Sequence, residues 1–225
     1  MKALDVMVRN VVTVKPDDAV ADAVMLLAEH DLSALPVVDD GNNVVGIISE
    51  ADLLHRQEIG TEKQRPWWLE AVTPASTLAG EFAKAHGRRV AELMSTDVVS
   101  AAEDTPLGEI ATMLERHRIK RVPVLRGGKL VGVVSRSNLI QALASSRAPA
   151  VGAGAEADRK IRQEVLDRLS QEAWTDFGER NVIVSGGIVH LWGLVGSAQE
   201  HKALLALAEG VLGVASVSDE MIPAY

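Results

Sequence analysis

The sequence predicts an α+β protein with two related β-α-β-β-α units and a smaller α-β-β-α-β unit. Three observations predict this fold. One segment of the chain occurs twice, each copy alternates short β-branched runs with amphipathic helical stretches, and residues 156–225 carry a different order of elements. With 225 residues the chain is long enough for such units to have cores of their own.

The duplication is visible when the sequence is compared with itself at a shift of 87 residues, which becomes 86 after a one-residue gap. The comparison aligns residues 7–53 with residues 94–139, and the stretch Val44–Leu54 recurs as Leu130–Ile140. An internal repeat of this kind indicates two copies of one structural unit.

Each copy of the recurring stretch reads as a strand that ends in serine and runs into a helix. Ser49 and Ser135 end the strands, and Asp52 and Asn138 follow three residues later in the first helical turn. A hydroxyl and a carboxylate in this position can bind the hydroxyls of a sugar, and the neighbouring backbone N–H groups favour negative charge. The alternative is that Asp52 only caps its helix.

The remaining elements are also the same in both copies. A first strand at Val11–Val14 or Val98–Ala101 precedes an amphipathic helix, and we expect Asp17 or Asp104 to cap that helix. Two strands joined by a turn come next and lead to the closing helix. The order within each copy is therefore β-α-β-β-α.

The third unit reads as helix, strand, Gly-Gly turn, strand, helix and strand. Its second strand alternates Val189 and Leu191 with His190 and Trp192, so we expect one pair to face the core and the other to face outward. We expect Trp192 to cover a helix or to touch a neighbouring domain. A lipid anchor is the alternative for this side chain.

Composition excludes several classes of function. The formal net charge of −8 disfavours attraction to nucleic acid or anionic lipid, so we expect no binding to duplex nucleic acid. The chain has no cysteine and no long apolar segment, which predicts a cytoplasmic protein that is not transmembrane. The six histidines lack metal-ligand spacing, and no phosphate loop or nucleophile motif is present. We therefore expect no enzyme, no metal site and no obligatory cofactor.

Residues 1–145 resemble a tandem pair of CBS domains. The resemblance is carried by Pro36-Val37 and Pro123-Val124, each preceded by an apolar residue, and by the Gly-x-x-Ser-x-x-Asp or Asn pattern that follows them. In that family the module often senses adenosine-containing ligands. The resemblance implies that the repeats pack with pseudo-twofold symmetry, leave two clefts between them, and form a homodimer.

Residues 156–225 resemble a BON domain. The resemblance is carried by the run Gly-Gly-Ile-Val-His-Leu-Trp-Gly at residues 186–193 and by Gly210-Val-Leu-Gly213-Val. It implies a module that contacts phospholipid or protein. The segment holds 6 basic and 11 acidic side chains, and this excess of acid disfavours anionic lipid headgroups.

These resemblances define the expected domain boundaries. The domains are a first CBS repeat at 1–60, a helical insertion at 61–89, a second repeat at 90–145, a small-residue linker at 146–155 and the BON-like domain at 156–225. Within the insertion we expect at least one of Trp67 and Trp68 to cover core surface. An anchor for a membrane or a partner is the alternative.

The CBS resemblance also implies the residues of the two clefts. The main cleft would comprise Ser49, Asp52, Ile47, Met94, Val98, Val99, Ser100, Lys120 and Arg121. The second, weaker cleft would comprise Met7, Val12, Val133, Ser135 and Asn138.

Charge distinguishes the two clefts. Residues 115–136 hold seven basic residues and one acid, whereas residues 28–50 hold five acids and no lysine or arginine. Lys120 and Arg121 can therefore attract phosphate into the main cleft, while Ser33 and Ala34 stand at the matching positions of the first repeat. We expect the main cleft to bind an adenine nucleotide (AMP, ADP or ATP), with S-adenosylmethionine also possible.

The leading hypothesis is a regulatory protein that senses an adenosine-containing ligand between its repeats and relays binding to a partner through the BON-like domain. The competing hypothesis is a constitutive dimeric adaptor, in which the repeats only dimerise and the BON-like domain binds phospholipid or an envelope protein.

Overall fold

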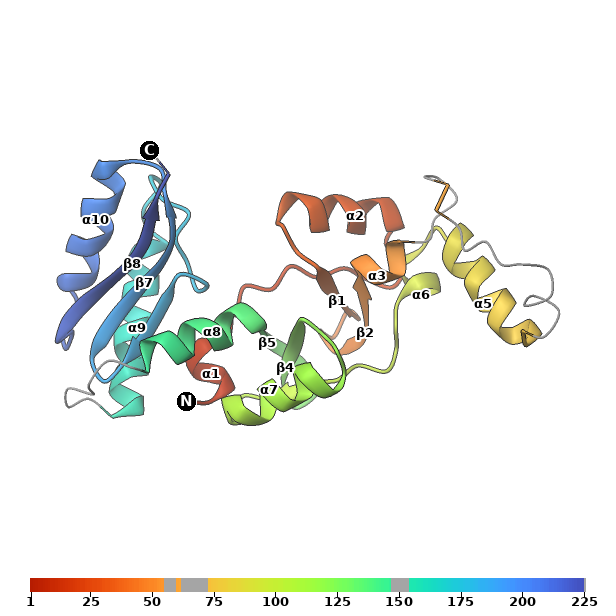
Figure 1. Ribbon diagram of the computed structural model, residues 1–225, viewed down its shortest axis with the longest axis horizontal. Coiled ribbons are helices and arrows are strands. Elements are labelled where there is room, and N and C mark those ends of the chain that lie inside the picture. The colour runs from red at the N-terminus through yellow and green to blue at the C-terminus, as the bar shows by residue number, and fades with distance from the viewer. Residues whose placement is uncertain (55–59, 62–72, 147–153, 225) are drawn as a thin grey trace. The chain divides into compact units, whose positions relative to one another are not determined.

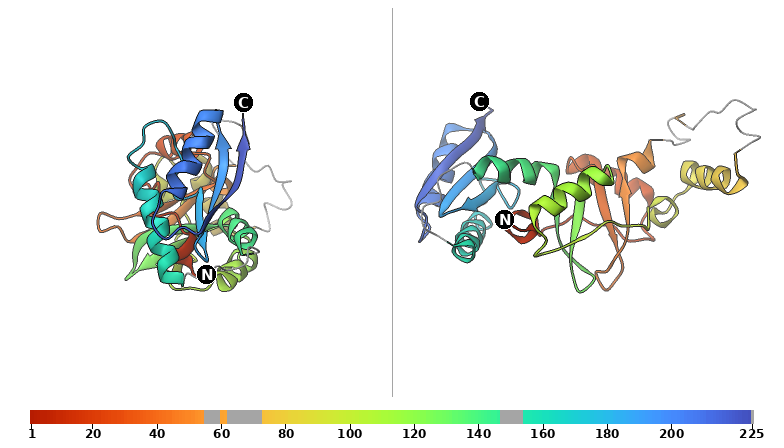
Figure 2. Two further views of the ribbon diagram at one scale, coloured as in Figure 1. Left: turned by 90° about the vertical axis from the view of Figure 1, so that its left-hand side faces the viewer. Right: turned by 60° about the horizontal axis from the view of Figure 1, so that its bottom comes forward.

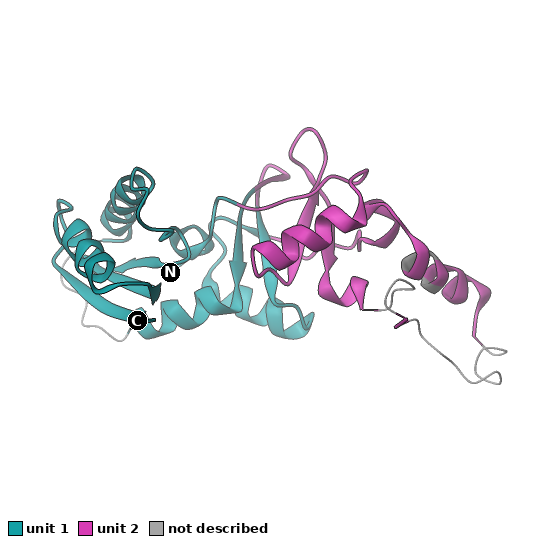
Figure 3. Cartoon of the chain, turned by 90° about the horizontal axis from the view of Figure 1, so that it is seen from above, with its two compact units in different colours: residues 1–10, 101–124, 131–225 teal, residues 11–100, 125–130 magenta. Residues whose placement is uncertain are grey.

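The structure is a computed structural model that describes residues 1–54, 60–61, 73–146 and 154–224 (Figure 1). Its mixture of helices with three small sheets confirms the predicted α+β class. The chain forms two compact units, shown in separate colours in Figure 3. Unit 1 comprises Met1–Asn10, Ala101–Val124 and Val131–Tyr225, and unit 2 comprises Val11–Ser100 and Leu125–Leu130.

Unit 2 contains most of the first repeat and the segment that follows it. Its elements are α2 (Val20–Glu29), β1 (Ala34–Val38), β2 (Val44–Ser49), α3 (Glu50–Leu53), α5 (Ala75–His86) and α6 (Val90–Leu93). Strands β1 and β2 form the predicted antiparallel hairpin, with Leu35 opposite Ile48. Both side chains are buried against the apolar face of α2, so the hairpin and helix share one core.

Unit 1 begins with the matching elements of the second repeat. They are α1 (Ala3–Val6), β3 (Ala101–Ala102), α7 (Leu107–Arg116), β4 (Arg121–Arg126), β5 (Lys129–Ser135) and α8 (Arg136–Ser145). The strands form one sheet in the order β3-β4-β5. Ile110 and Leu114 of α7 are buried against Val122 and Val124 of β4 in the core of this repeat.

The short helix before each repeat packs into the core of the other repeat. Ala3 and Val6 of α1 precede the first repeat, yet they belong to the core built around Ile110 in unit 1. Conversely, Val90 and Leu93 of α6 precede the second repeat and complete the core of unit 2. Each core therefore depends on a segment from the other copy.

This exchange explains why the predicted first strands are wrong in extent. Of Val11–Val14, only Val14 pairs with β1: its N–H donates to the Pro36 carbonyl (3.2 Å) and its carbonyl accepts from Val38 (2.9 Å). In the second copy the strand is β3 rather than Val98–Ala101. Because the chain passes between the two units at residues 10–11 and 100–101, only the end of each segment reaches a sheet.

The predicted acidic caps are also wrong. The N-cap positions of α2 and α7 are Ala19 and Pro106, neither of which caps through a side chain. Asp17 lies two residues before the α2 cap, where its carboxylate pairs with Arg89 at 3.1 Å. The chain makes a turn before each helix starts, which moves the acidic residues out of the cap position.

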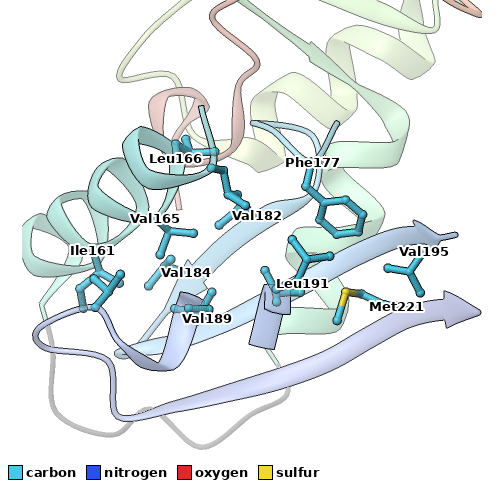
Figure 4. Close-up of a cluster of buried hydrophobic side chains, with 14 residues drawn as sticks. Ile161, Val165, Leu166, Phe177, Val182, Val184, Val189, Leu191, Val195 and Met221 are labelled. Carbon is cyan, nitrogen blue, oxygen red and sulfur yellow. The ribbon is translucent and has the colours of Figure 1, made fainter. Parts of the chain in front are cut away.

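The C-terminal domain confirms the predicted α-β-β-α-β order. Its elements are α9 (Ala155–Leu169), β6 (Val182–Ser185), β7 (Ile188–Val195), α10 (Ala198–Glu209) and β8 (Ser216–Pro223). Strand β7 pairs antiparallel with β6 and parallel with β8. Val189 and Leu191 point into the core beneath α9 and α10, as expected (Figure 4).

The other face of this sheet is buried too. Helices α9 and α10 cover one face, while α8 lies on the opposite side (Figure 2). Ile183, which is opposite His190 in the β6–β7 register, belongs to the core of the second repeat. His190 points away from the face of Val189 and Leu191, yet it is 2% exposed, because the C-terminal domain packs on the second repeat within unit 1. The expectation that one of the two pairs faces outward is therefore wrong for His190.

Candidate ligand-binding half-sites

In unit 2, the end of strand β2 holds Ser49 and Asp52 in direct contact. The Ser49 N–H and hydroxyl both donate to Asp52 Oδ2, at 3.0 and 2.8 Å. Ser49 is the N-cap of α3 and Asp52 is the third helical residue, so the two form a capping box. The alternative that Asp52 caps its helix is thus correct as geometry, and the cap also fixes the carboxylate at the end of the strand.

A second segment lies against the same strand. The N–H of Ile47 donates to the Ser95 carbonyl at 2.9 Å, and the N–H of Ser95 donates back at 2.8 Å. A Cβ atom at Gly46 would lie 2.5 Å from Met94 Sδ, so any larger residue here would force the Met94 side chain to move. The structure therefore brings Ile47, Ser49, Asp52 and Met94 together in one half-site.

The second repeat builds the same half-site in unit 1. The N–H and hydroxyl of Ser135 donate to Asn138 Oδ1 at 2.9 and 2.7 Å. Val133 exchanges two backbone hydrogen bonds with Val8, at 2.9 and 3.0 Å. A Cβ atom at Gly132 would lie 2.7 Å from Met7 Sδ.

The two half-sites differ in charge and burial. Asp52 is a half-buried acidic residue, whereas Asn138 is neutral and buried. Met7 is buried while Met94 is half-buried. An anionic carboxylate accepts a ribose hydroxyl more strongly than an amide does, so only the half-site with Asp52 offers a charged acceptor.

Lys120 and Arg121 lie at the start of β4 in unit 1. The N–H of Arg136 donates to the Lys120 carbonyl at 3.1 Å, just as the N–H of Glu50 donates to the Ser33 carbonyl at 3.1 Å in unit 2. These matching bonds place the pair Lys120 and Arg121 where the first repeat has Ser33 and Ala34. Because Ser49 and Asp52 belong to unit 2, the predicted meeting with these cations stays a prediction.

The other predicted residues divide between the units. Val12, Val98, Val99 and Ser100 are half-buried in unit 2, whereas Met7, Val133, Ser135 and Asn138 belong to unit 1. Trp67 and Trp68 lie outside the described residues. Trp192 is half-buried, and its indole N–H has no hydrogen-bond partner in the described part of the chain.

Across residues 1–54, 60–61, 73–146 and 154–224, no group of three His, Asp or Glu side chains could hold a metal ion. No helix within those ranges is long and apolar enough to cross a membrane.

Sequence reasoning missed a buried arginine in α9. Arg162 is 4% exposed, and burial lowers the pKa of its guanidinium to about 10. The sequence carried a signal for this burial, because Arg162 lies at helical spacing from the apolar residues Val165, Leu166 and Leu169, which are buried from the same helix. A charged residue inside an apolar helical stripe indicates a specific set of partners.

The chain thus contains two related α+β repeats, each with one half-site of the same design, followed by a C-terminal domain. The family model described as "CBS domain" matches residues 3–58 and 90–145, and the "BON domain" model matches residues 157–222. The chain belongs to the CBS domain family and carries a BON domain after the pair.

Two curated relatives are similar to this chain over part of their length. The chloroplastic CBS domain-containing protein CBSX2 of Arabidopsis thaliana is 31% identical over 140 residues, which cover 60% of this chain and 59% of that protein. An uncharacterized protein of Methanocaldococcus jannaschii is 29% identical over 143 residues, which cover 64% of this chain and 32% of that protein. The chain thus spans less than two thirds of either relative.

One solved structure is similar to this chain over almost the whole of its own length. The crystal structure of CBSX2 in complex with AMP is 30% identical, with a TM-score of 0.57. The match covers 65% of this chain and 99% of that chain.

Proposed function

We propose that this is a cytoplasmic, non-enzymatic regulatory protein that binds an adenosine-containing ligand between its CBS repeats and relays binding through its BON domain. The observation that carries the proposal is the half-site of Ser49 and Asp52. In it the end of β2, the carboxylate of the helix-capping Asp52 and the segment Met94–Ser95 lie together. The complex of the CBS-pair relative with AMP supports an adenine nucleotide as ligand.

The proposed contacts follow from the chemistry of the residues. Asp52 accepts hydrogen bonds from ribose hydroxyls, while Ile47 and Met94 offer apolar surface to the base. Lys120 and Arg121 neutralise phosphate. In the second cleft Asn138 replaces the carboxylate, so binding there is weaker or selects a neutral ligand.

Isothermal titration with AMP, ADP and ATP tests this proposal, with S-adenosylmethionine as a further ligand. Asp52→Asn removes the charge but keeps an oxygen that can cap α3, and we expect it to weaken nucleotide binding about tenfold. The matched variant Asn138→Asp supplies a carboxylate to the other half-site, and we expect it to strengthen the weaker binding event. If Asp52→Asn leaves the tighter binding event unchanged, or Asn138→Asp does not strengthen the weaker one, the proposed difference between the two clefts is wrong.

The same titration separates sensor from adaptor. If no adenosine compound binds the wild-type protein at millimolar concentration, the sensing proposal fails. Capture of the protein by liposomes in that case would support the adaptor, in which the CBS pair only dimerises.

We also propose that the protein is a homodimer that forms through the CBS pair. Ile140 and Leu143 on α8 support this proposal, because both apolar side chains are largely exposed in the single chain. They lie on the helix that closes the second repeat.

A further inference from the structure

Within unit 1 the BON domain holds the segment that leads into the first repeat, and it does so through a buried arginine. Arg162 of α9 donates from Nε to the Val182 carbonyl (2.9 Å) and from Nη2 to the Glu179 carbonyl (2.8 Å). The same Nη2 donates to the Met7 carbonyl at 3.3 Å, across 155 positions of sequence. A buried guanidinium that donates a hydrogen bond to a carbonyl distant in sequence holds that carbonyl in place.

Glu179 holds the next two residues of the segment. Its Oε2 accepts from the backbone N–H groups of Arg9 (2.5 Å) and Asn10 (2.8 Å), and its Oε1 lies 3.5 Å from the Arg9 guanidinium. A second ion pair joins Arg159 of α9 to Asp5 at 2.6 Å. The BON domain therefore binds residues 5–10 at several successive points.

The opposite side of this segment is part of the second half-site. Met7 packs on Gly132, and Val8 pairs with Val133 on β5. Anything that moves Met7 or Val8 must therefore move atoms bonded to Arg162 and Glu179.

The first half-site provides an internal comparison. Met94 packs on Gly46 and Ser95 pairs with Ile47 in the same manner. In the described part of the chain, however, no side chain binds the backbone of Thr96 or Asp97, which align with Arg9 and Asn10. The repeats are thus alike in their half-sites and different in their connection to the BON domain.

We propose that Arg162 and Glu179 are positioning residues that couple the BON domain to the second half-site through residues 7–10. A change at Met7 or Val8 loosens the loop around Glu179, and loosening that loop frees the half-site in turn. The inference rests on the proposed function only where a ligand causes the change.

The test uses the full-length protein and matched glycine variants. Gly132→Ala places a methyl group 2.7 Å from Met7 Sδ, and Gly46→Ala places one 2.5 Å from Met94 Sδ. Amide hydrogen exchange is measured in the BON domain over residues 178–182. We expect Gly132→Ala to speed exchange there about tenfold and Gly46→Ala to leave it unchanged. Equal responses, or no response to either variant, would overturn the proposal.

A second variant guards against global unfolding, because removal of the buried Arg162 would leave several carbonyls without a donor. Glu179→Gln removes the charge but keeps the shape of the side chain. We expect faster exchange at Asn10 in this variant, and a reduced response of the BON domain when Gly132→Ala is added. Protection at Asn10 equal to wild type would contradict the role of Glu179.

Ligand titration then distinguishes the two proposals. If AMP binds, Glu179→Gln should change the affinity of the weaker event and leave the tighter one unaltered, and the reverse pattern would overturn the coupling. If no nucleotide binds while the glycine variants behave as expected, the proposed sensing function fails and the coupling stands.

Discussion

At the residue scale, Asp52 has one observed role in capping α3 and one proposed role in binding ligand, and a variant must separate the two. Its carboxylate accepts the Ser49 N–H and so stabilises the start of α3. In the proposed function it also binds ribose. Asp52→Ala would remove the acceptor of the Ser49 N–H in the capping box, which costs about 1 kcal/mol, so it would change stability and binding together. The asparagine variant separates the two roles, because Asn138 already accepts the N–H of the N-cap residue Ser135 in the capping box of α8.

Another carboxylate near a helix start predicts a pH dependence of stability. Glu92 accepts backbone hydrogen bonds from Arg89 (3.2 Å) and Arg88 (2.7 Å), and these bonds lower the pKa of Glu92 below its ordinary value of 4.5. The native state therefore binds this proton more weakly than the unfolded state. The stabilisation is complete above pH 4.5 and is lost as the pH falls through the lowered pKa.

Glu92→Gln should consequently reduce the free energy of unfolding more at pH 7 than at pH 3. Urea unfolding at both pH values measures the difference. Glu209→Gln, an exposed change near the end of α10, is the control. The interpretation fails if Glu92→Gln lowers stability equally at both pH values.

At the element scale, the hairpins and helices could be predicted because their signals are local. Strand β2 shows its β-branched run and the serine that ends it, and strand β7 of the BON domain follows from the period-two alternation around Val189. The capping boxes at Ser49 and Ser135 also follow from residue type and spacing.

The burial of each helix predicts how it responds to truncation. Ile110 of α7 is fully buried, whereas Met25 of α2 is 65% exposed. We expect Ile110→Ala to lower the free energy of unfolding by about 2–5 kcal/mol, because it leaves a cavity. Met25→Ala should lower it by about 0.5 kcal/mol or less. Chemical denaturation measures both, and similar losses would contradict the assigned cores.

At the scale of the whole molecule, prediction reached its limit at contacts between distant segments. The two copies have nearly the same apolar pattern, so nothing local indicates that α1 packs around Ile110 while α6 packs in unit 2. The burial of His190 escaped prediction for the same reason, since it depends on a second domain covering the sheet. Arg162 left a local trace, but its partner Met7 lies 155 residues away.

The proposed dimer gives a prediction at this scale. A double variant, Ile140→Glu with Leu143→Glu, places two charges on the exposed face of α8 and should convert the dimer to a monomer of 24.0 kDa. Light scattering after size exclusion measures the mass. Leu212→Glu is the control, because Leu212 is 95% exposed on the BON domain. A wild-type monomer, or a double variant that remains dimeric, would contradict the interface.

The packing of α1 and α6 in the cores of the opposite repeats has a consequence for fragments of the chain. A fragment with only the first repeat and its preceding helix would lack Val90 and Leu93, which belong to its core. A fragment with only the second repeat and its preceding helix would lack Ala3 and Val6. Each repeat therefore needs the other copy to complete its core, so we expect neither repeat to fold stably alone.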